Sequence, residues 1–401
     1  MEENIILNKC PVCDDPTDNS ERLLDNFIEL NNKQLHYSVD VCDNCGAMYT
    51  VQRTRYNELY TPKANIEKKH GHQNQTQAFA LENIWNYANK MLQVEELLSA
   101  LSGNDCNYLE IGASDGSLFY LFQLKAKQKG IEVTGTLIES TGAAQICEEL
   151  GNCKVISKSF MDQNIVFDRK YDVAILSNCL EHFDNPRQII AKVRSLLKEG
   201  GLLYIEVPDA TRYDTSISYP LGYYHVVNYN IINLDYMIHN AGFEVFDMDI
   251  RDQYPGMRIA AIKKDINKKT IDNLSYRLTK SIFNRWKIRR ERIFTSLEKI
   301  KEKIAGKILI YGAGVHTKAL IDRFSGWLSD DNVVFYDSNE EIKLFMGRSL
   351  LSHDQLNLDD YEAIIISSYG YQEQIFRHLV QLGYPEKKII RLYDRVLAYT
   401  M

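Results

Sequence analysis

A regular alternation of strand-like and helix-like segments through the middle of this 401-residue chain constrains its fold most. Apolar runs rich in Val, Ile and Leu alternate with runs of helical spacing, and glycines stand where the helices should stop. The segments are, in order, 107–112, 117–130, 133–139, 141–151, 154–157, 171–178, 186–201 and 202–207. Strands separated by such helices run parallel, so residues 106–264 are predicted to form a doubly wound α/β sheet.

The first strand of this pattern runs into a glycine-rich turn that precedes a helix. Glycine lets the backbone pass close to a ligand where a side chain would block it. We therefore expect this turn to bind a cofactor through Glu110, Gly112, Ser114, Asp115 and Gly116.

Two carboxylates near the turn indicate which cofactor it binds. Glu139 ends the second strand, where an acid accepts hydrogen bonds from ribose hydroxyls. Glu110 precedes the first glycine, where a carboxylate would repel the pyrophosphate of NAD but suits the cationic methionine end of S-adenosylmethionine (SAM). The pattern predicts SAM rather than NAD.

Four of the eight cysteines form two CxxC pairs near the start of the chain, Cys10 with Cys13 and Cys42 with Cys45. Two such pairs can surround one ion tetrahedrally, and four cysteines leave no open position. The loop between the pairs is longer than in the usual ribbon and indicates an extra hairpin. Residues 1–60 are therefore predicted to form a ribbon around a structural zinc ion.

The remaining segments read as helical connectors and a second α/β domain. Residues 61–105 and 265–305 have helical spacing. Residues 306–401 contain a strand that ends in Gly312-Ala-Gly314 before a helix, which predicts a second, smaller Rossmann-like domain. No third glycine completes a dinucleotide motif, so we expect a nucleotide-recognition or packing role.

Charge and hydropathy restrict the partners. The formal net charge of -7 disfavours nucleic acid, and no apolar stretch approaches the length of a membrane span. We expect a cytoplasmic protein with a small-molecule substrate. The oligomeric state stays open.

The glycine turn, the acid after the second strand and residues 177–183 together resemble class I SAM-dependent methyltransferases over roughly residues 105–262. The resemblance implies that Gly112, Gly116 and the Glu110 region contact the methionine part of SAM, and Glu139 the ribose. It also implies that Asn178 flanks the sulfonium and that Ser159 and Phe160 cover the adenine.

The order of all the parts resembles one family over nearly the whole chain, the sugar C-methyltransferases. These enzymes act on nucleotide-linked 4-keto deoxysugars, and their C-terminal unit helps to hold the nucleotide-sugar. Carbon methylation needs a base that removes a proton beside the ketone, and groups that stabilise the enolate. The resemblance therefore implies a SAM-dependent C-methyltransferase with a nucleotide-sugar substrate.

Histidines and tyrosines after the fourth and fifth strands are the catalytic candidates. An imidazole titrates near neutral pH. We expect His225 to be the base and His182 to position the substrate, with Tyr223 and Tyr224 able to hydrogen-bond a ketone or enolate oxygen. The alternative for His182 is that it caps or orders the next helix.

Two departures from the family pattern leave the methylated atom open. The family's acid ahead of His225 is missing, and its tyrosine-rich segment after the ribbon is reduced to Tyr56 and Tyr60. An O- or N-methyltransferase of a sugar-like molecule is the alternative enzyme. A non-catalytic zinc-binding scaffold is the third interpretation, against which the intact Glu110 and Glu139 argue.

Overall fold

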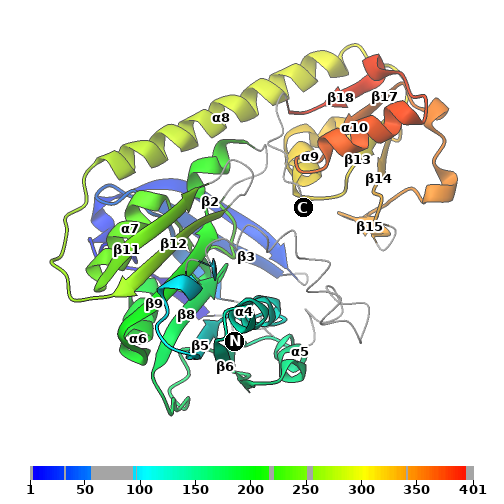
Figure 1. The fold of residues 1–401 in the computed structure, drawn as a ribbon. Helices are drawn as coiled ribbons and strands as arrows, with labels where there is room; N and C mark the ends of the chain where they lie inside the picture. Colours follow the sequence, from blue (N-terminus) through cyan, green and yellow to red (C-terminus); the bar gives the residue numbers. More distant parts are fainter. Residues whose placement is uncertain are drawn as a thin grey trace. The chain divides into compact units, whose positions relative to one another are not determined.

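The computed structural model divides the chain into two compact units (Figure 1). Unit 1 comprises residues 1–210 and 221–279, and unit 2 comprises 211–220 and 280–400. The predicted connector at 61–105 lies mostly outside the described residues, as do Tyr56 and Tyr60. The structure describes residues 3–30, 33–55, 94–95, 97–215, 221–250, 256–339 and 342–393.

A seven-stranded sheet forms the centre of unit 1. From one edge to the other its strands are β11 (Phe243–Ile250), β12 (Gly256–Lys263), β9 (Leu197–Pro208), β8 (Tyr171–Ser177), β5 (Asp105–Ile111), β6 (Glu132–Ile138) and β7 (Cys153–Ile156). The five strands from β9 to β7 are parallel, as predicted, whereas β12 is antiparallel to both neighbours. The sheet is thus mixed. Residues 251–255 alone separate β11 from β12, which is too short for a parallel crossover.

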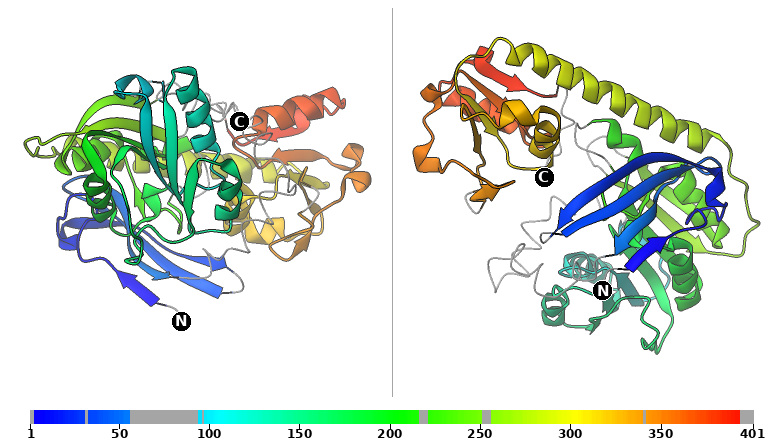
Figure 2. Two further views of the ribbon diagram at one scale, coloured as in Figure 1. Left: turned by 60° about the horizontal axis from the view of Figure 1, so that its bottom comes forward. Right: turned by 180° about the vertical axis from the view of Figure 1, so that it is seen from behind.

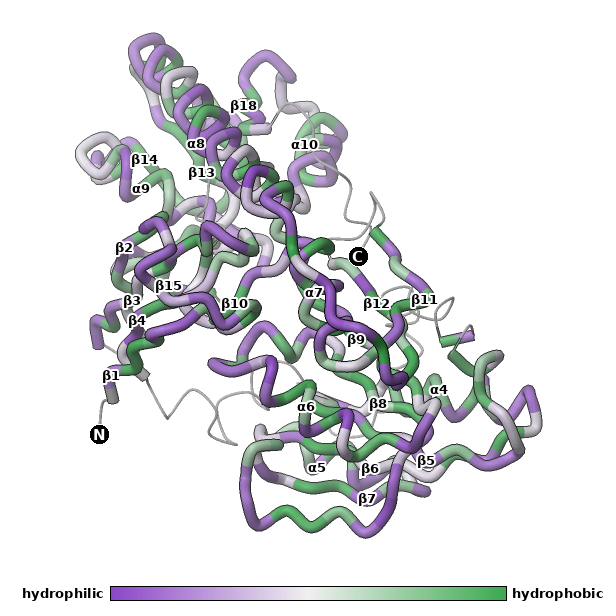
Figure 3. The backbone as a smooth tube through the Cα atoms, turned by 90° about the vertical axis from the view of Figure 1, so that its left-hand side faces the viewer, coloured by the Kyte–Doolittle hydropathy of each residue, from purple (hydrophilic) through white to green (hydrophobic). Residues whose placement is uncertain are grey.

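Helices cover both faces of this sheet, and the side chains of the strands alternate between two cores. Val173 and Ile175 of β8 pack in the core that includes Phe119, whereas Ala174 and Leu176 pack in the core that includes Ile190. Figure 3 shows β8 as largely hydrophobic, as expected for a strand that is buried on both faces. Among the described residues, the helices of this part include α4 (Ser117–Gln128), α5 (Ala144–Cys147), α6 (Pro186–Leu196) and α7 (Ile231–Asn240), and residues 97–100 are helical too.

Helix α6 ends at Leu196, several residues before the predicted stop at Gly200 and Gly201. The chain enters β9 at Leu197, which pairs with Tyr171 of β8 and is 1% exposed. Burial of this leucine in the sheet outweighs the helical pattern of the sequence around it.

The N-terminal strands form a second sheet in unit 1, in the order β1 (Glu3–Ile6), β4 (Met48–Arg55), β3 (Lys33–Cys42) and β2 (Ser20–Leu30). The long loop between the cysteine pairs contains the hairpin of β2 and β3, as predicted. A further strand, β10 (Val227–Asn228), pairs with β4 although it follows β9 of the seven-stranded sheet in the sequence. One core joins both sheets, and Figure 2 shows the blue strands packed against the green ones.

Unit 2 is built on a parallel four-stranded sheet in the order β14 (Val333–Tyr336), β13 (Ile308–Tyr311), β17 (Ala363–Ile366) and β18 (Ile389–Arg391). Its helices are α9 (Val315–Leu328), α10 (Gln372–Gln381) and most of α8 (Leu274–Lys301), and β15 (Leu344–Phe345) pairs with β16 (Arg348–Ser349). In the described part of the chain, no helix is both long and apolar enough to cross a membrane.

Short 3-10 turns complete the two units. They are η1 (Thr17–Asn19), η3 (Glu148–Leu150), η4 (Leu180–His182), η5 (Ala210–Thr215), η6 (His353–Gln355), η7 (Leu358–Asp360) and η8 (Glu386–Lys388).

Candidate active site

The predicted cofactor turn lies at the carboxyl end of β5 and leads into α4. Its residues Gly112, Ser114 and Gly116 have φ angles of 74°, 52° and 73°, in the left-handed region. A Cβ on Gly112 would lie 2.6 Å from the Sγ atom of Cys179. Glycine is therefore required at position 112, where the turn passes directly over the segment that follows β8.

Glu139 follows β6 and holds this turn through its carboxylate. Its Oε2 atom accepts a hydrogen bond from the backbone N–H of Ser114 at 2.8 Å, and Oε1 accepts one from Thr141 at 2.7 Å. The side chain is buried. Each carboxylate oxygen has a second lone pair, so Glu139 can accept further hydrogen bonds in this orientation.

The two other acids of the turn are also buried and hydrogen-bonded. Glu110 accepts a hydrogen bond from the hydroxyl of Tyr108 at 2.6 Å, and burial raises the pKa of Tyr108 well above its usual value. Asp115 accepts one at 3.0 Å from the N–H of Ser117, the first residue of α4. Both carboxylates belong to a preformed turn.

The other predicted SAM contacts differ in exposure. Asn178 is exposed directly after β8, with a φ of 49°, and its N–H donates to the carbonyl of Glu206. Ser159 is exposed, whereas Phe160 is 2% exposed and its ring lies 6.2 Å from that of Phe167. Phe160 is thus a core residue, whereas the predicted cover of the adenine would need an exposed face.

The two candidate histidines lie together although they are far apart in sequence. The rings of His182 and His225 are 5.3 Å apart between centroids, at 62°. His182 lies in η4 after β8, and His225 lies in the segment that follows β9. The Nδ1 atom of His182 is 2.8 Å from the carbonyl oxygen of Tyr224, so we assign the proton to Nδ1 and the lone pair to Nε2.

Burial keeps both imidazoles neutral. It lowers the pKa of His225 to about 4, with a further contribution from His182. It also lowers the pKa of His182, although the hydrogen bond to Tyr224 opposes this. The pKa of each histidine is thus lowered from its ordinary value, and both imidazoles carry a lone pair at pH 7.

The segment that carries His225 is held by strand β4 of the N-terminal sheet, a contact that the sequence did not predict. The N–H of Thr50 donates to the carbonyl of Val226 at 2.7 Å, and β10 continues the pairing with β4. The hydroxyl of Tyr223 donates to the carbonyl of Thr54. Tyr223 is thus buried in this contact, whereas Tyr224 is 38% exposed.

Arg53 of β4 is a second residue of the N-terminal sheet at this site, and it was not among the predicted residues. Its Nη2 atom donates to Asp184 at 2.8 Å, two residues after His182, and the side chain is largely buried. The strand alternation places Arg53 on the same face as Val51, which was the available signal. The partner Asp184 could not be found from sequence.

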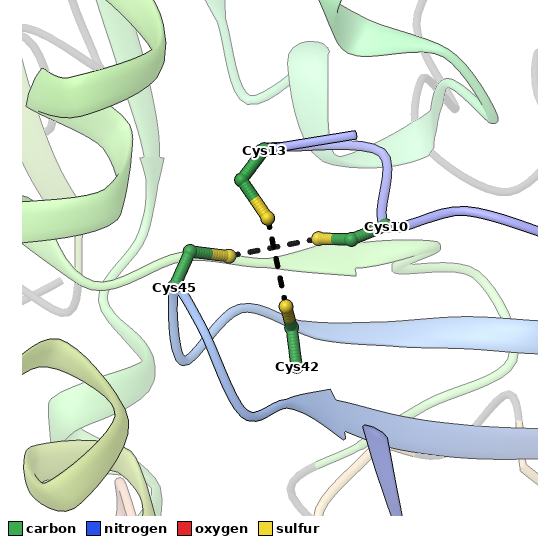
Figure 4. Close-up of side chains that lie close together, drawn as sticks. All are labelled: Cys10, Cys13, Cys42 and Cys45. Carbon is green, nitrogen blue, oxygen red and sulfur yellow. Dashed lines mark hydrogen bonds between the residues drawn. The ribbon is translucent and has the colours of Figure 1, made fainter. Parts of the chain in front are cut away.

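The four cysteines of the two CxxC pairs converge on one point (Figure 4). The Sγ atoms of Cys10 and Cys45 are 3.5 Å apart, as are those of Cys13 and Cys42, and all four lie within 4.8 Å of one another. A tetrahedral zinc site with Zn–S bonds of ~2.3 Å has sulfur atoms about 3.8 Å apart. The donor set and its spacing fit zinc.

The crowding of these thiols shifts their pKa values in opposite directions. Burial raises the pKa of Cys10 well above its usual value, and the neighbouring thiols raise that of Cys45. Hydrogen bonds from the other thiols lower the pKa of Cys42. Four sulfur atoms this close favour a bound cation, which would let all of them ionise.

Unit 2 contains a similar glycine turn after β13. Gly312 has a φ of 117°, and a Cβ there would lie 2.6 Å from the carbonyl oxygen of Ser367. Asp337, which follows β14, accepts a hydrogen bond from the N–H of Ala313 at 2.7 Å. The arrangement repeats that of Glu139 and Ser114 in unit 1.

Two family models match the chain. Residues 84–247 match the model described as "Methyltransferase domain", and residues 304–390 match the model described as "C2185-like, N-terminal". The first match spans the glycine turn, Glu139 and the His182 turn, and the mixed seven-stranded sheet is that of class I methyltransferases. The protein is a class I SAM-dependent methyltransferase, and SAM is its cofactor.

Solved methyltransferase structures are also similar to part of the chain. An O-methyltransferase family protein from Burkholderia thailandensis is 16% identical, with a TM-score of 0.38, over 48% of this chain and 60% of that one. A SAM-dependent methyltransferase from Mesorhizobium loti is 11% identical, with a TM-score of 0.33, over 42% and 96%.

A third structure contains a bound product of the cofactor. It is the 1,6-didemethyltoxoflavin-N1-methyltransferase of Burkholderia thailandensis with S-adenosylhomocysteine, which is 18% identical, with a TM-score of 0.34, over 46% of this chain and 82% of that one. A search of curated proteins gave no match. Similarity at this level does not identify the acceptor of the methyl group.

Proposed function

We propose that the protein transfers the methyl group of SAM to a carbon beside the ketone of a nucleotide-linked 4-keto deoxysugar. The observation that carries the proposal is the pair of neutral imidazoles, His182 and His225, 5.3 Å apart between ring centroids. They follow the carboxyl ends of strands β8 and β9, on the side of the sheet where the cofactor turn also lies. Doubly wound folds bind their ligands at the carboxyl ends of the strands. The sugar itself rests on the sequence resemblance.

Each candidate has a role in this reaction. His225 removes the proton beside the ketone, and His182 positions the substrate. The exposed Tyr224 hydrogen-bonds the ketone or enolate oxygen, whereas the buried Tyr223 holds the segment against the ribbon. A base and an oxygen-binding group of this kind are what enolate formation requires.

The cofactor lies in the turn after β5 in this proposal. Glu139 binds the ribose, because its carboxylate is buried and already oriented by two backbone N–H groups. The remaining SAM contacts are Glu110, Gly112, Ser114, Asp115, Gly116, Ser159, Phe160 and Asn178.

The cysteine cluster is proposed to bind one structural zinc ion. All eight cysteines are free thiols, and the four in the cluster have the spacing of a closed tetrahedral site. Free thiols also fit the cytoplasmic location expected from the sequence. Unit 2 is proposed to be Rossmann-like and to help hold the nucleotide-sugar, which its glycine turn with Asp337 supports.

The test is methyl transfer to a panel of nucleotide-sugars, with and without a 4-keto group. The purified protein is incubated with methyl-labelled SAM and each compound, and mass spectrometry shows which compound gains the label. Labelling of the keto sugars alone supports the proposal. Labelling of sugars that lack a ketone, and not of keto sugars, would overturn it.

One observation favours an O- or N-methyltransferase as a second candidate. The residue before His225 is Tyr224 rather than the acid of the resembling family, and the pKa of His225 is lowered to about 4. A base this weak suits deprotonation of a positioned hydroxyl or amine during transfer better than that of a carbon. Methyl transfer to an oxygen or nitrogen in the same panel identifies this case.

A further inference from the structure

The residues at the end of β8 and in the His225 segment place three ligand-type groups around one point. Glu181, His182 and His225 each offer one ligand atom, and the three atoms lie within 4.8 Å of one another. Glu181 is 2% exposed, and the two histidines are partly buried. We propose that these three side chains bind a divalent first-row transition-metal ion, separate from the ion of the cysteine cluster.

The distances between the three side chains suit ligands of one shared ion better than hydrogen bonds between the side chains themselves. The Nε2 atom of His182 lies 3.8 Å from Oε1 of Glu181, which is too long for a hydrogen bond. Ligand atoms at ~2.1 Å from one ion lie roughly 3–3.5 Å apart in octahedral or tetrahedral sites. An inward movement of about 1 Å by the side chains brings all three into range.

The surroundings orient the ligands in the manner of known metal sites. A metal-binding histidine usually donates its other ring N–H to a carbonyl or carboxylate, which fixes the tautomer. His182 has this arrangement, because Nδ1 bonds the carbonyl of Tyr224 and leaves Nε2 for the ion. The charge of Arg53, which reaches His182, is paired with the carboxylate of Asp184.

The donor set selects the kind of ion. Two imidazoles and one carboxylate suit Zn²⁺, Co²⁺, Fe²⁺ or Mn²⁺, whereas Mg²⁺ and Ca²⁺ prefer oxygen ligands alone. Three protein ligands leave at least one open position, unlike the closed cysteine site. An acceptor oxygen can occupy that position. Because a bound ion takes up the lone pair of His225 that the proposed base uses, proton removal by His225 belongs to the protein without this ion.

The test is a titration with Co²⁺ of the full chain that already contains its cysteine-bound zinc. The protein is first treated with EDTA and its zinc content is measured, and Co²⁺ binding is then followed by equilibrium dialysis and visible absorption. We expect one Co²⁺ per chain, with d–d bands but without the near-ultraviolet charge-transfer band of a cobalt thiolate. This readout needs no methyl acceptor, so it is independent of the proposed function.

Variants locate the ion. His225→Gln and Glu181→Gln should each weaken Co²⁺ binding at least tenfold, and His225→Glu, which keeps a ligand, should restore part of it. The matched control is His239→Gln, because His239 bonds the carbonyl of Asn267 away from the cluster. No second ion in the wild-type protein, a thiolate band, or equal weakening by His239→Gln would overturn the proposal.

Discussion

Glu139 is the residue on which the SAM site depends most directly. Its carboxylate orients the turn through Ser114 and is proposed to bind the ribose, so Glu139→Ala removes charge-assisted hydrogen bonds worth roughly 1.5–3 kcal/mol. We expect SAM affinity to fall about ten- to a hundredfold by calorimetry. Glu132→Ala, at the exposed start of β6, is the control. Wild-type affinity in Glu139→Ala would show that SAM binds elsewhere.

Substitution of His225 should lower the rate of methyl transfer and leave the binding of SAM unchanged. Whether it acts as the base or as a ligand, His225→Asn should lower turnover by roughly 10²–10⁴ with little change in SAM affinity. His239→Asn is the matched control, since His239 lies on α7. Near-normal turnover in both His225→Asn and His182→Asn would exclude a catalytic role for the pair.

His316 in unit 2 makes the stability of that unit depend on pH. Its Nδ1 atom is 2.5 Å from the hydroxyl of Tyr393, and burial lowers its pKa to about 4. The unfolded chain, with a histidine pKa of ~6.5, binds more protons between these values, so stability falls as the pH drops through this window.

The expected loss is at most about 1.4 kcal/mol per pH unit. Hydrogen exchange of the β13 and β17 amides at pH 7 and 5 measures it. His316→Asn should remove this part of the pH dependence, whereas His378→Asn, at an exposed position of α10, should not. An unchanged pH dependence in His316→Asn would contradict the account.

At the scale of elements, the N-terminal sheet and the seven-stranded sheet's domain are joined at the segment that carries His225. Strand β4 pairs with β10 and holds the backbone of Val226, next to His225. The second cysteine knuckle is also fixed, because the hydroxyl of Ser275 donates to the carbonyl of Cys45 at 2.6 Å. Disorder in the knuckle would therefore reach the segment of His225.

Loss of the cysteine cluster should consequently lower the turnover rate much more than it lowers the affinity for SAM. Cys42→Ser should lose the bound zinc, measured by metal analysis, and lower turnover at least tenfold, while calorimetry finds SAM affinity within a few-fold of wild type. Cys153→Ser, in β7 and outside the cluster, is the control. Full zinc content in Cys42→Ser would contradict the proposed ligand set, and normal turnover would contradict the coupling to His225.

The local elements were predictable because each depends on a short stretch of sequence. The turn from β5 to α4 follows from the spacing of Gly112 and Gly116, and the hairpin between the cysteine pairs follows from the length of the loop. The pairing of β10 with β4 was not predictable. Strand β10 has two residues, and its partners Tyr49 and Met48 are far away in sequence.

The same limit applies to the contacts of the site. The sequence indicated that His182 and His225 both follow carboxyl ends of strands in the same sheet. It did not indicate how the two rings are oriented toward each other. The ion pair of Arg53 with Asp184 joins strand β4 to the segment between η4 and α6 and depends on tertiary packing alone. The antiparallel β12 was missed because the strand-and-helix pattern did not extend to the end of the domain.

At the scale of the whole molecule, unit 1 is proposed to transfer the methyl group, and unit 2 is proposed to help recognise the nucleotide-sugar. We propose a division of the chain into five parts. These are a ribbon, a connector, a methyltransferase domain, a second connector and a C-terminal domain. The basis of this division is the sequence pattern, together with the match of residues 304–390 to a second family model.

The central claim, deprotonation of a carbon beside a ketone at the His225 site, can be measured without methyl transfer. The protein is incubated in D₂O with a nucleotide-linked 4-keto deoxysugar and with S-adenosylhomocysteine in place of SAM, and NMR follows the adjacent C–H. The account predicts that the wild-type protein exchanges this hydrogen for deuterium, and that His225→Asn slows the exchange by roughly 10²–10⁴. No exchange above the rate without protein, in a protein that still methylates the same sugar, would contradict it.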